Sequence, residues 1–285
     1  MSLIKILVNP TSGNGAGKKL FSEAKKLNTI CQVQETDPKN IIKQIKNFVV
    51  EHDTVIIAGG DGTVNLVMNA LYHSDLYKTV KIALFPLGTG NDLAKAYNIK
   101  PISLKYFLIN LPNHKTIQIS LWCFNDRVFT NYISWGIDAW ALKLVTRWRR
   151  YFPQRRWLMQ PLYFFAGLIT LFRWQKNQLS SSELSISSPL LSLILCNINS
   201  YAGGCPVVIG SSSAPQLHVI KIRDHWDLIN LMWRRFSHKP YPTTAIKATT
   251  ILINADNIDA EVDGEMLVNC KGIIKYCGQI TFVLN

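Results

Sequence analysis

The chain has 285 residues, of which 48% are hydrophobic and 17% are charged, and its formal net charge is +13. This composition excludes a disordered protein, and the length predicts two domains because single cores seldom grow beyond about 250 residues. The positive charge favours an anionic partner: a nucleotide, a nucleic acid or an anionic membrane. The first residues show no signal peptide, and the longest apolar run, Leu162–Phe172, is about half the ~20 residues that cross a bilayer. We therefore expect a cytoplasmic protein that touches a membrane without spanning it.

The cysteines and histidines argue against a zinc or redox enzyme. No C-x-x-C pair occurs, so buried free thiols are expected rather than a zinc site or a dithiol centre. None of the six histidines has metal-ligand spacing or pairs with a Ser or Cys elbow, which excludes zinc-enzyme and hydrolase chemistry. The six cysteines are Cys31, Cys123, Cys196, Cys205, Cys270 and Cys277.

The first third of the chain repeats one unit three times: an apolar strand, a glycine-bearing loop and a helical pattern. This alternation predicts an α/β domain with a largely parallel sheet, which we place at residues 1–116. The strands are Ile4–Val8, Thr54–Ala58 and Ile82–Phe85, and the loops that follow them are Asn9–Gly17, Gly59–Gly62 and Pro86–Asp92.

After about Leu111 the pattern changes to alternating runs with few helices between them, which predicts a second, mainly antiparallel β domain over residues 117–285. Two runs around Asn125 and Asp126 indicate a β-hairpin. Helical patterns interrupt the domain at 138–174 and 224–236, and the last residues are candidates to return to the first domain. The later strands are expected at 184–188, 190–196, 217–222, 249–254, 258–262 and 280–284.

The glycine-rich loops are suited to binding phosphate, because loop amides and helix N-termini gather where parallel strands end. In the second loop Gly59, Gly60 and Gly62 allow the backbone close to a phosphate, and Asp61 could orient Mg²⁺ or a reacting hydroxyl. Thr63 could cap the following helix and also touch phosphate. One such turn alone is more often a tight bend, and neither the P-loop nor the G-x-G-x-x-G pattern is matched. The prediction of a phosphate site therefore depends on all three loops, each of which follows a strand.

Four motifs together resemble the diacylglycerol kinase catalytic domain family, which includes sphingosine kinases and the YegS-like and DgkB-like lipid kinases of bacteria. They are NPTSG at 9–13, GGDGTVN at 59–65, PLGTGNDLA at 86–94 and DGE at 263–265. GGDG alone is shared with NAD kinases and phosphofructokinases, but the combination in this order is specific.

The resemblance implies an N-terminal nucleotide-binding α/β domain, like that of phosphofructokinases and NAD kinases, and a C-terminal β-sandwich that takes a lipid. It also implies ATP and Mg²⁺ as cofactors. The nucleotide contacts that it implies are Asn9, Pro10, Thr11, Ser12, Gly13, Thr36, Gly59, Gly60, Asp61, Gly62, Thr63, Val64, Asn65, Gly88, Thr89, Gly90, Asn91 and Asp92.

Two carboxylates are candidates for the proton acceptor of phosphoryl transfer, a reaction that otherwise needs positioning and charge neutralisation. Glu265 matches the acceptor of the bacterial members, and Asp61 matches that of sphingosine kinases. Without the resemblance, residues 263–265 would be interpreted as an ordinary hairpin turn. The chain has Ser120 and the run Ser213–Pro215 where bacterial members carry metal-binding aspartates. The auxiliary magnesium site is therefore not expected, and the metal ligands stay open.

The predicted function is a lipid kinase that transfers the γ-phosphate of ATP to the hydroxyl of a diacylglycerol-, sphingoid- or phosphatidylglycerol-like lipid. One alternative is a catalytically weakened relative that binds nucleotide and membrane, motivated by the missing aspartates. A second alternative is an NAD kinase, against which the first and third loop motifs argue.

A basic, aromatic segment begins at Lys143 and runs to Trp174, and its composition suits the headgroup region of an anionic membrane. The alternative is a solvated basic helix. No RNA-binding motif accompanies the segment, so a nucleic-acid partner is not expected. The arginines expected to contact anionic lipid are Arg147, Arg149, Arg150, Arg155 and Arg156.

Overall fold

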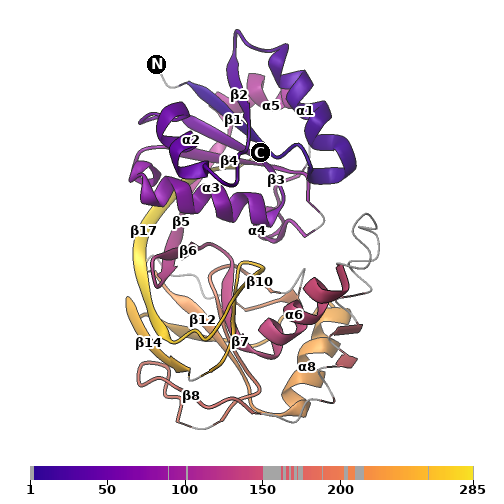
Figure 1. Ribbon diagram of the computed structural model, residues 1–285, viewed down its shortest axis with the longest axis vertical. Helices are drawn as coiled ribbons and strands as arrows, with labels where there is room; N and C mark the ends of the chain where they lie inside the picture. The colour runs from indigo at the N-terminus through magenta and orange to yellow at the C-terminus, as the bar shows by residue number, and fades with distance from the viewer. Residues whose placement is uncertain are drawn as a thin grey trace. The chain divides into compact units, whose positions relative to one another are not determined.

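The computed structural model describes residues 3–88, 90–100, 102–149, 162, 165–166, 168–169, 172, 176–187, 189–201, 205–208, 215–255 and 257–284. The chain divides into two compact units. Unit 1 comprises Met1–Thr130 and Tyr276–Asn285, and unit 2 comprises Asn131–Lys275. Figure 1 shows the elements of each unit along the chain.

Unit 1 is built on a parallel sheet in the order β2-β1-β3-β4. Every residue of β3 is buried, which is typical of a parallel strand with both faces covered. The end of β17 continues the sheet as a parallel neighbour of β4 (Figure 1). The strands are β1 (Ile4–Val8), β2 (Cys31–Glu35), β3 (Thr54–Gly59), β4 (Lys81–Pro86) and β17 (Gly272–Leu284).

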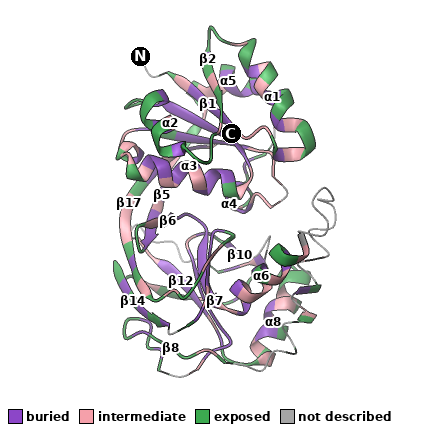
Figure 2. Cartoon of the chain, in the orientation of Figure 1, coloured by how far each residue is buried: buried purple, intermediate pink, exposed green. Residues whose placement is uncertain are grey.

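Helices bury their apolar stripes against this sheet. On α1, Leu20 and Ala24 share a core with Phe107 of α5 and with Ile6 and Ile56 of the central strands. In Figure 2 the strands β1, β3 and β4 are mostly buried and the edge strand β2 is largely exposed, whereas the helices alternate buried and exposed positions. The helices are α1 (Ala16–Lys25), α2 (Ile41–Phe48), α3 (Asp61–His73), α4 (Asp92–Ala96) and α5 (Leu104–Asn110), with short 3₁₀ turns η1 (Ser12–Gly15), η2 (Leu76–Lys78) and η3 (Leu111–Asn113).

The predicted hairpin forms from β5 (Lys115–Phe124) and β6 (Arg127–Phe129), with positive φ at Asn125 and Asp126. The hairpin belongs to unit 1. Residues 117–130 are therefore part of the first unit, whereas the sequence placed them in the second domain. The reason is a tertiary contact: on α3, Asn69 donates from Nδ2 to the Val128 carbonyl at 3.0 Å and accepts from the Val128 amide at 2.9 Å. Sequence alternation alone does not reveal such a contact.

The cysteines differ in part from the expectation of free thiols. Cys123 of β5 and Cys277 of β17 form a disulfide, so the expectation is wrong for this pair. The pairing of these strands, 154 residues apart, brings the sulfurs together. The other four cysteines are free thiols. Cys31, Cys196 and Cys205 are buried, and Cys270 is half-buried.

Unit 2 is mainly antiparallel, as predicted. A six-stranded sheet has the order β13-β12-β9-β7-β15-β16, and β14 pairs antiparallel with both β17 and β8. Together with the α/β unit, this confirms the predicted fold class. The strands are β7 (Tyr132–Gly136), β8 (Leu179–Ser180), β9 (Ser192–Cys196), β10 (Ser200–Tyr201), β11 (Cys205–Pro206), β12 (Leu217–Ile222), β13 (Thr244–Ile246), β14 (Thr250–Ala255), β15 (Ala260–Val262) and β16 (Glu265–Leu267).

One predicted strand of unit 2 is wrong. The described part of this range, residues 184–187, contributes no named strand: Ser185 has φ +49 and its amide bonds the Ser182 carbonyl at 3.0 Å. A run of serines competes for backbone hydrogen bonds and favours a turn. The two predicted helical stretches contain α6 (Ile137–Arg149) and α8 (His225–Phe236). Along the described ranges, no helix combines the length and apolar character needed to cross a membrane.

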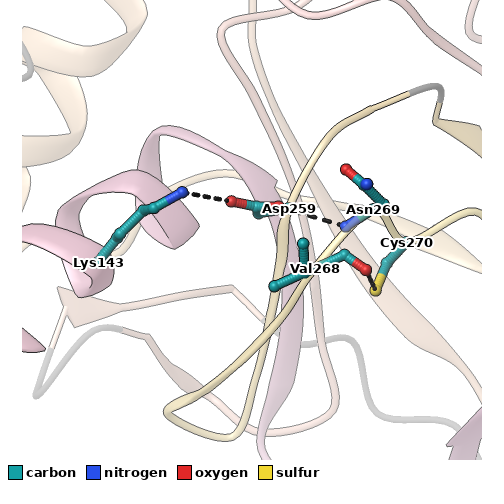
Figure 3. Close-up of polar contacts among 5 residues, drawn as sticks. All are labelled: Lys143, Asp259, Val268, Asn269 and Cys270. Atoms are coloured by element: carbon teal, nitrogen blue, oxygen red, sulfur yellow. Dashed lines mark hydrogen bonds and ion pairs between the residues drawn. The ribbon is translucent and has the colours of Figure 1, made fainter.

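The start of the basic, aromatic segment is tied to unit 2 itself. On α6, Lys143 Nζ lies 3.3 Å from Asp259 Oδ2, and the other carboxylate oxygen of Asp259 accepts from the Asn269 amide at 3.3 Å (Figure 3). Beside this contact, Cys270 Sγ donates to the Val268 carbonyl (Figure 3). The Lys143 side chain is largely exposed, so this ion pair adds little stability.

Candidate active site

The three predicted loops come together where β1, β3 and β4 end. The second and third touch along their main chains: the Leu87 amide donates to the Gly59 carbonyl at 2.9 Å. A Cβ on Gly88 would lie only 2.5 Å from Gly60 Cα. Glycine is therefore required at this contact, because any side chain would push the two loops apart.

The first loop is joined to the second by a side chain. Asn9 donates from Nδ2 to Thr63 Oγ1 at 2.9 Å, and its amide bonds the Ala58 carbonyl at the end of β3. Asn9 Oδ1 in turn accepts from the Thr11 amide and hydroxyl, at 3.0 and 2.8 Å. Gly13 has φ +64 and lies close to the third loop: a Cβ added at this position would be 2.8 Å from the Leu87 carbonyl oxygen. The three loops thus form one connected structure.

The second loop leads directly into α3, whose N-cap is Gly60. The amides of Thr63 and Val64 bond the Gly60 carbonyl. The first turn of a helix leaves amides without intrahelical partners and carries partial positive charge, so it attracts anions. Gly62 is exposed there, and a Cβ at that position would meet nothing within 4 Å. The outer side of this turn is thus open to a phosphate group.

Asp61 is the acidic group at this helix start. Its Oδ1 accepts from the Asp92 amide at 2.8 Å, and a Cβ on Gly90 would lie 2.7 Å from its Oδ2. Burial, together with the neighbouring charge of Asp92, raises the pKa of Asp61 to about 6. A carboxylate whose pKa lies this close to neutrality is suited to accepting a proton.

The third loop is shaped by Asn91, which adopts φ +52, a conformation that asparagine tolerates. Its side chain accepts from the Gly88 amide at 3.0 Å and donates to the Gly88 carbonyl at 2.8 Å. Thr89, between them in this loop, lies outside the described residues. Asn91 therefore builds the loop that meets Gly60.

Other predicted contacts occupy different surroundings. Thr36 lies beside the first loop, because its amide bonds the Val8 carbonyl at 2.9 Å. Asn65 is buried and donates to the Val128 carbonyl at 3.1 Å, so its side chain holds the β5-β6 hairpin on α3. Val64 and Ser12 are also buried. The side chains gathered at the loop surface are thus fewer than the motifs suggest.

The loop sequences also match those of known proteins. Residues 4–123 match the family model of the diacylglycerol kinase catalytic domain. Human diacylglycerol kinase zeta is 28% identical over 169 residues, which are 49% of this chain and 18% of that protein. Diacylglycerol kinase of Staphylococcus carnosus is 27% identical over 138 residues, 46% of this chain and 44% of that protein. The chain thus spans less than half the length of these curated relatives.

The matches confirm the family resemblance predicted from the loop motifs. A solved structure of a diacylglycerol kinase from Bacillus anthracis superposes with a TM-score of 0.75 at 15% identity, covering 100% of this chain and 97% of that chain. At this identity the similarity shows the fold alone. It covers unit 2 as well as residues 4–123, which match the family model.

The DGE motif lies in unit 2, outside the matched diacylglycerol kinase catalytic domain. It forms the turn between β15 and β16, with φ +48 at Asp263 and +86 at Gly264. The buried Asp263 carboxylate accepts from the amides of Asn131 and Tyr132, at 2.9 and 3.0 Å. Sequence reasoning missed this structural role. Glu265, the first residue of β16, is exposed.

No group of three or more His, Cys, Asp or Glu residues suited to a metal ion occurs among the residues that the structure describes. Ser120 lies half-buried on β5, and Ser213 falls outside the described residues. Among the described residues, no cluster of carboxylate oxygens of the kind that Mg²⁺ prefers is thus present.

A buried polar cluster in unit 2 also escaped sequence reasoning. Asp138, at the start of α6, accepts from Ser192 Oγ at 2.7 Å and from the Tyr201 hydroxyl. Beside it, the Tyr132 hydroxyl donates to Glu261 at 3.2 Å. Desolvation raises the pKa of Asp138, which favours its protonated form. An aspartate directly after a buried strand is the signal that could have found it.

Proposed function

We propose that the protein is an ATP-dependent lipid kinase that transfers the γ-phosphate of ATP to a hydroxyl of a membrane lipid. One observation carries the proposal: the main chains of Gly60 and Gly88 meet beside the N-terminus of α3. At the same helix start, the outer side of Gly62 is open. The match of residues 4–123 to the diacylglycerol kinase catalytic domain supports the same activity.

ATP would be held by the loop structure. The amides at the start of α3 would bind phosphate oxygens, and the Asn9–Thr63 contact would keep the first loop against them. ATP supplies the phosphoryl group, and a Mg²⁺ ion carried on its phosphates neutralises their charge. Thr36, at the end of β2, would border the nucleotide on the side of the first loop.

Two carboxylates remain candidates to take the proton of the lipid hydroxyl. Asp61 is fixed by the Asp92 amide, and its pKa of about 6 leaves it ionised and able to accept a proton near pH 7. Glu265 is exposed at the start of β16, in the DGE turn that resembles the acceptor position of the bacterial lipid kinases. We assign proton acceptance to this pair and expect single variants to tell them apart.

The acceptor lipid is proposed as diacylglycerol-like, since the curated relatives are diacylglycerol kinases; sphingoid and phosphatidylglycerol-like lipids are the other candidates. The substrate would be reached by peripheral association with an anionic membrane. Arg147 is exposed on α6 and suits that contact. Arg150, Arg155 and Arg156, which were expected to join it, lie outside the described residues, as does the side chain of Arg149.

The test is a radiolabelled ATP assay with the full chain and a panel of lipids in mixed micelles with Mg²⁺. We expect one lipid class to be phosphorylated. Of the variants Asp61→Ala and Glu265→Ala, the one that removes the proton acceptor should lower the rate at least a hundredfold, and the other should lower it less. Tyr106→Ala, an exposed substitution on α5, should leave the rate unchanged. Absence of lipid phosphorylation with every lipid and metal ion would sink the proposal.

A second candidate is a relative that binds nucleotide and membrane without turnover. Ser120 favours it, as does the lack of a three-residue acidic metal group among the described residues. Calorimetric ATP binding together with no transfer to any lipid would identify this case. Phosphorylation of NAD in the same assay would instead support an NAD kinase.

A further inference from the structure

Helix α8 presents apolar side chains on two opposite faces. Leu228 and Leu231 face inward and are buried in the core of unit 2 with residues of β12, such as Ile220 and Ile222. Four large apolar residues follow the spacing of three and four that places them along one other face. They are Trp226, Ile229, Trp233 and Phe236, with exposed fractions of 77, 43, 53 and 61%.

The fold does not require this outer stripe. Leu228 and Leu231 already anchor α8, and one apolar face suffices for a surface helix. Each aromatic side chain offers about 150–250 Å² of surface, so three rings more than half exposed form an apolar patch of a few hundred Å². Patches of that size on a soluble domain mark interaction sites. In Figure 2, α8 carries exposed positions along its length beside its buried ones.

The charge beside the stripe selects the partner. From Leu228 to Ala255 the sequence contains no Asp or Glu, whereas Arg234 and Arg235 lie in the last turn of α8 and Lys239 lies three residues beyond its end. The Lys239 ammonium lies 5.0 Å from the ring centroid of Trp233, which places a cation at the edge of the aromatic stripe. The acidic residues of the helix, at its other end, are engaged locally: Asp224 caps α8 and Asp227 accepts from the Arg223 amide.

We propose that this face of α8, defined by Trp226, Ile229, Trp233 and Phe236, is a docking surface for an anionic lipid bilayer. Tryptophan and phenylalanine insert at the headgroup boundary, and neighbouring arginine and lysine bind anionic headgroups. A second copy of the chain is disfavoured as the occupant, because each copy carries a formal net charge of +13. This proposal rests on the proposed function, because a lipid kinase meets its substrate at a membrane surface.

The experiment is co-sedimentation of the full chain, without nucleotide, with vesicles of phosphatidylcholine alone or mixed with phosphatidylglycerol. The pair Trp226→Gln and Trp233→Gln should lower the partition coefficient for the mixed vesicles at least tenfold. The matched pair Tyr106→Gln and Ile109→Gln, on the exposed side of α5, should change it less than twofold. Arg235→Gln with Lys239→Gln should abolish the preference for phosphatidylglycerol. Circular dichroism confirms that each variant is folded.

Equal binding by the wild type and the tryptophan variant would overturn the proposal. So would sedimentation velocity data in which the wild type is a dimer and the tryptophan variant a monomer, because the face would then belong to a second copy. Kinase activity on micellar lipid is measured in parallel. Vesicle binding without phosphorylation would count against the proposed function alone, and phosphorylation without vesicle binding against the docking surface alone.

Discussion

Asn9 donates a hydrogen bond from Nδ2 to Thr63 Oγ1 across 2.9 Å, and this contact joins the first glycine-bearing loop to the second. The two residues are 54 positions apart in sequence. Since Asn9 Oδ1 also holds Thr11, one side chain orders both the loop to which it belongs and the start of α3. A nucleotide site built on these loops depends on such contacts for its shape.

Removing this contact should weaken ATP binding without unfolding unit 1. We expect Thr63→Val to raise the ATP dissociation constant about fivefold, because a net hydrogen bond contributes about 1 kcal/mol. Thr63→Ser keeps the hydroxyl and should bind within twofold of the wild type. Titration calorimetry measures both, and a cycle with Asn9→Ala should give a coupling of about 1 kcal/mol. Additive effects in that cycle would contradict the role of the contact.

Two glycine substitutions should have opposite consequences for stability. Gly88→Ala places a Cβ 2.5 Å from Gly60 Cα and should destabilise the chain by about 1–3 kcal/mol while lowering ATP affinity at least tenfold. Gly62→Ala meets nothing within 4 Å, lies in α3, and should leave stability unchanged or raise it by up to about 1 kcal/mol. Denaturant unfolding provides the measurement. If Gly62→Ala also weakens ATP binding, the open face of Gly62 is where phosphate approaches; unaltered binding argues against that approach.

Because the pKa of Asp61 is raised, replacing Asp61 by a neutral residue should increase the free energy of unfolding by an amount that depends on pH. The folded chain keeps this proton up to about pH 6, whereas an unfolded aspartate loses it near pH 4. The folded state therefore binds more protons between these values, and stability falls as the pH rises through that window. Asp61→Asn should raise the free energy of unfolding at pH 8 by on the order of 2 kcal/mol and leave it unchanged at pH 4.

Asp61→Asn keeps an oxygen that can accept from the Asp92 amide, so its geometry is a fair match to the wild type. Urea unfolding at both pH values makes the comparison. A loss of stability of equal size at pH 4 and pH 8 would show that the substitution acts through packing, against the electrostatic account. Asp92→Asn should give a smaller gain of the same sign, because the charge of Asp92 is the second cause of the shift.

The DGE turn should separate into a structural and a functional residue. Asp263→Ala removes the acceptor of two buried amides, those of Asn131 and Tyr132, and should destabilise the chain by about 2–4 kcal/mol. Asp263→Asn keeps an acceptor and tolerates the positive φ, so it should lose less. Glu265→Gln should lower kinase activity with no change in thermal unfolding. Thermal melts with parallel activity assays distinguish the three variants, and a Glu265→Gln melt as low as that of Asp263→Ala would refute this division.

Local pattern was sufficient for much of the fold. The strand-loop-helix units of unit 1 follow from short apolar runs interrupted by glycine, and β12 was predicted at its observed bounds, Leu217–Ile222. The hairpin turn at Asn125 and Asp126 could be predicted because both residues tolerate positive φ. The strand expected at 184–188 is replaced, over its described residues, by a tight turn in which Ser185 has φ +49 and its amide bonds the Ser182 carbonyl, a local contact that hydrophobic alternation does not reveal.

Contacts between distant segments could not be predicted in this way. Asn65 belongs to a motif and was expected at the nucleotide, yet its side chain is buried against Val128. The disulfide between Cys123 and Cys277 depends on the pairing of β5 with β17, which no spacing along the chain reveals. The exposed stripe of α8 is visible only once the structure identifies which apolar face is buried.

The sequence by itself determined the order of the elements, the three glycine-bearing loops and the family that those loops resemble. These properties depend on backbone preferences and on side chains close together along the chain. Only the tertiary structure decided that Gly60 and Gly88 touch, that burial and Asp92 raise the pKa of Asp61, and that Asp263 supports the backbone at Asn131. Each of these depends on distance and burial in space, which folding sets and which sequence separation does not encode.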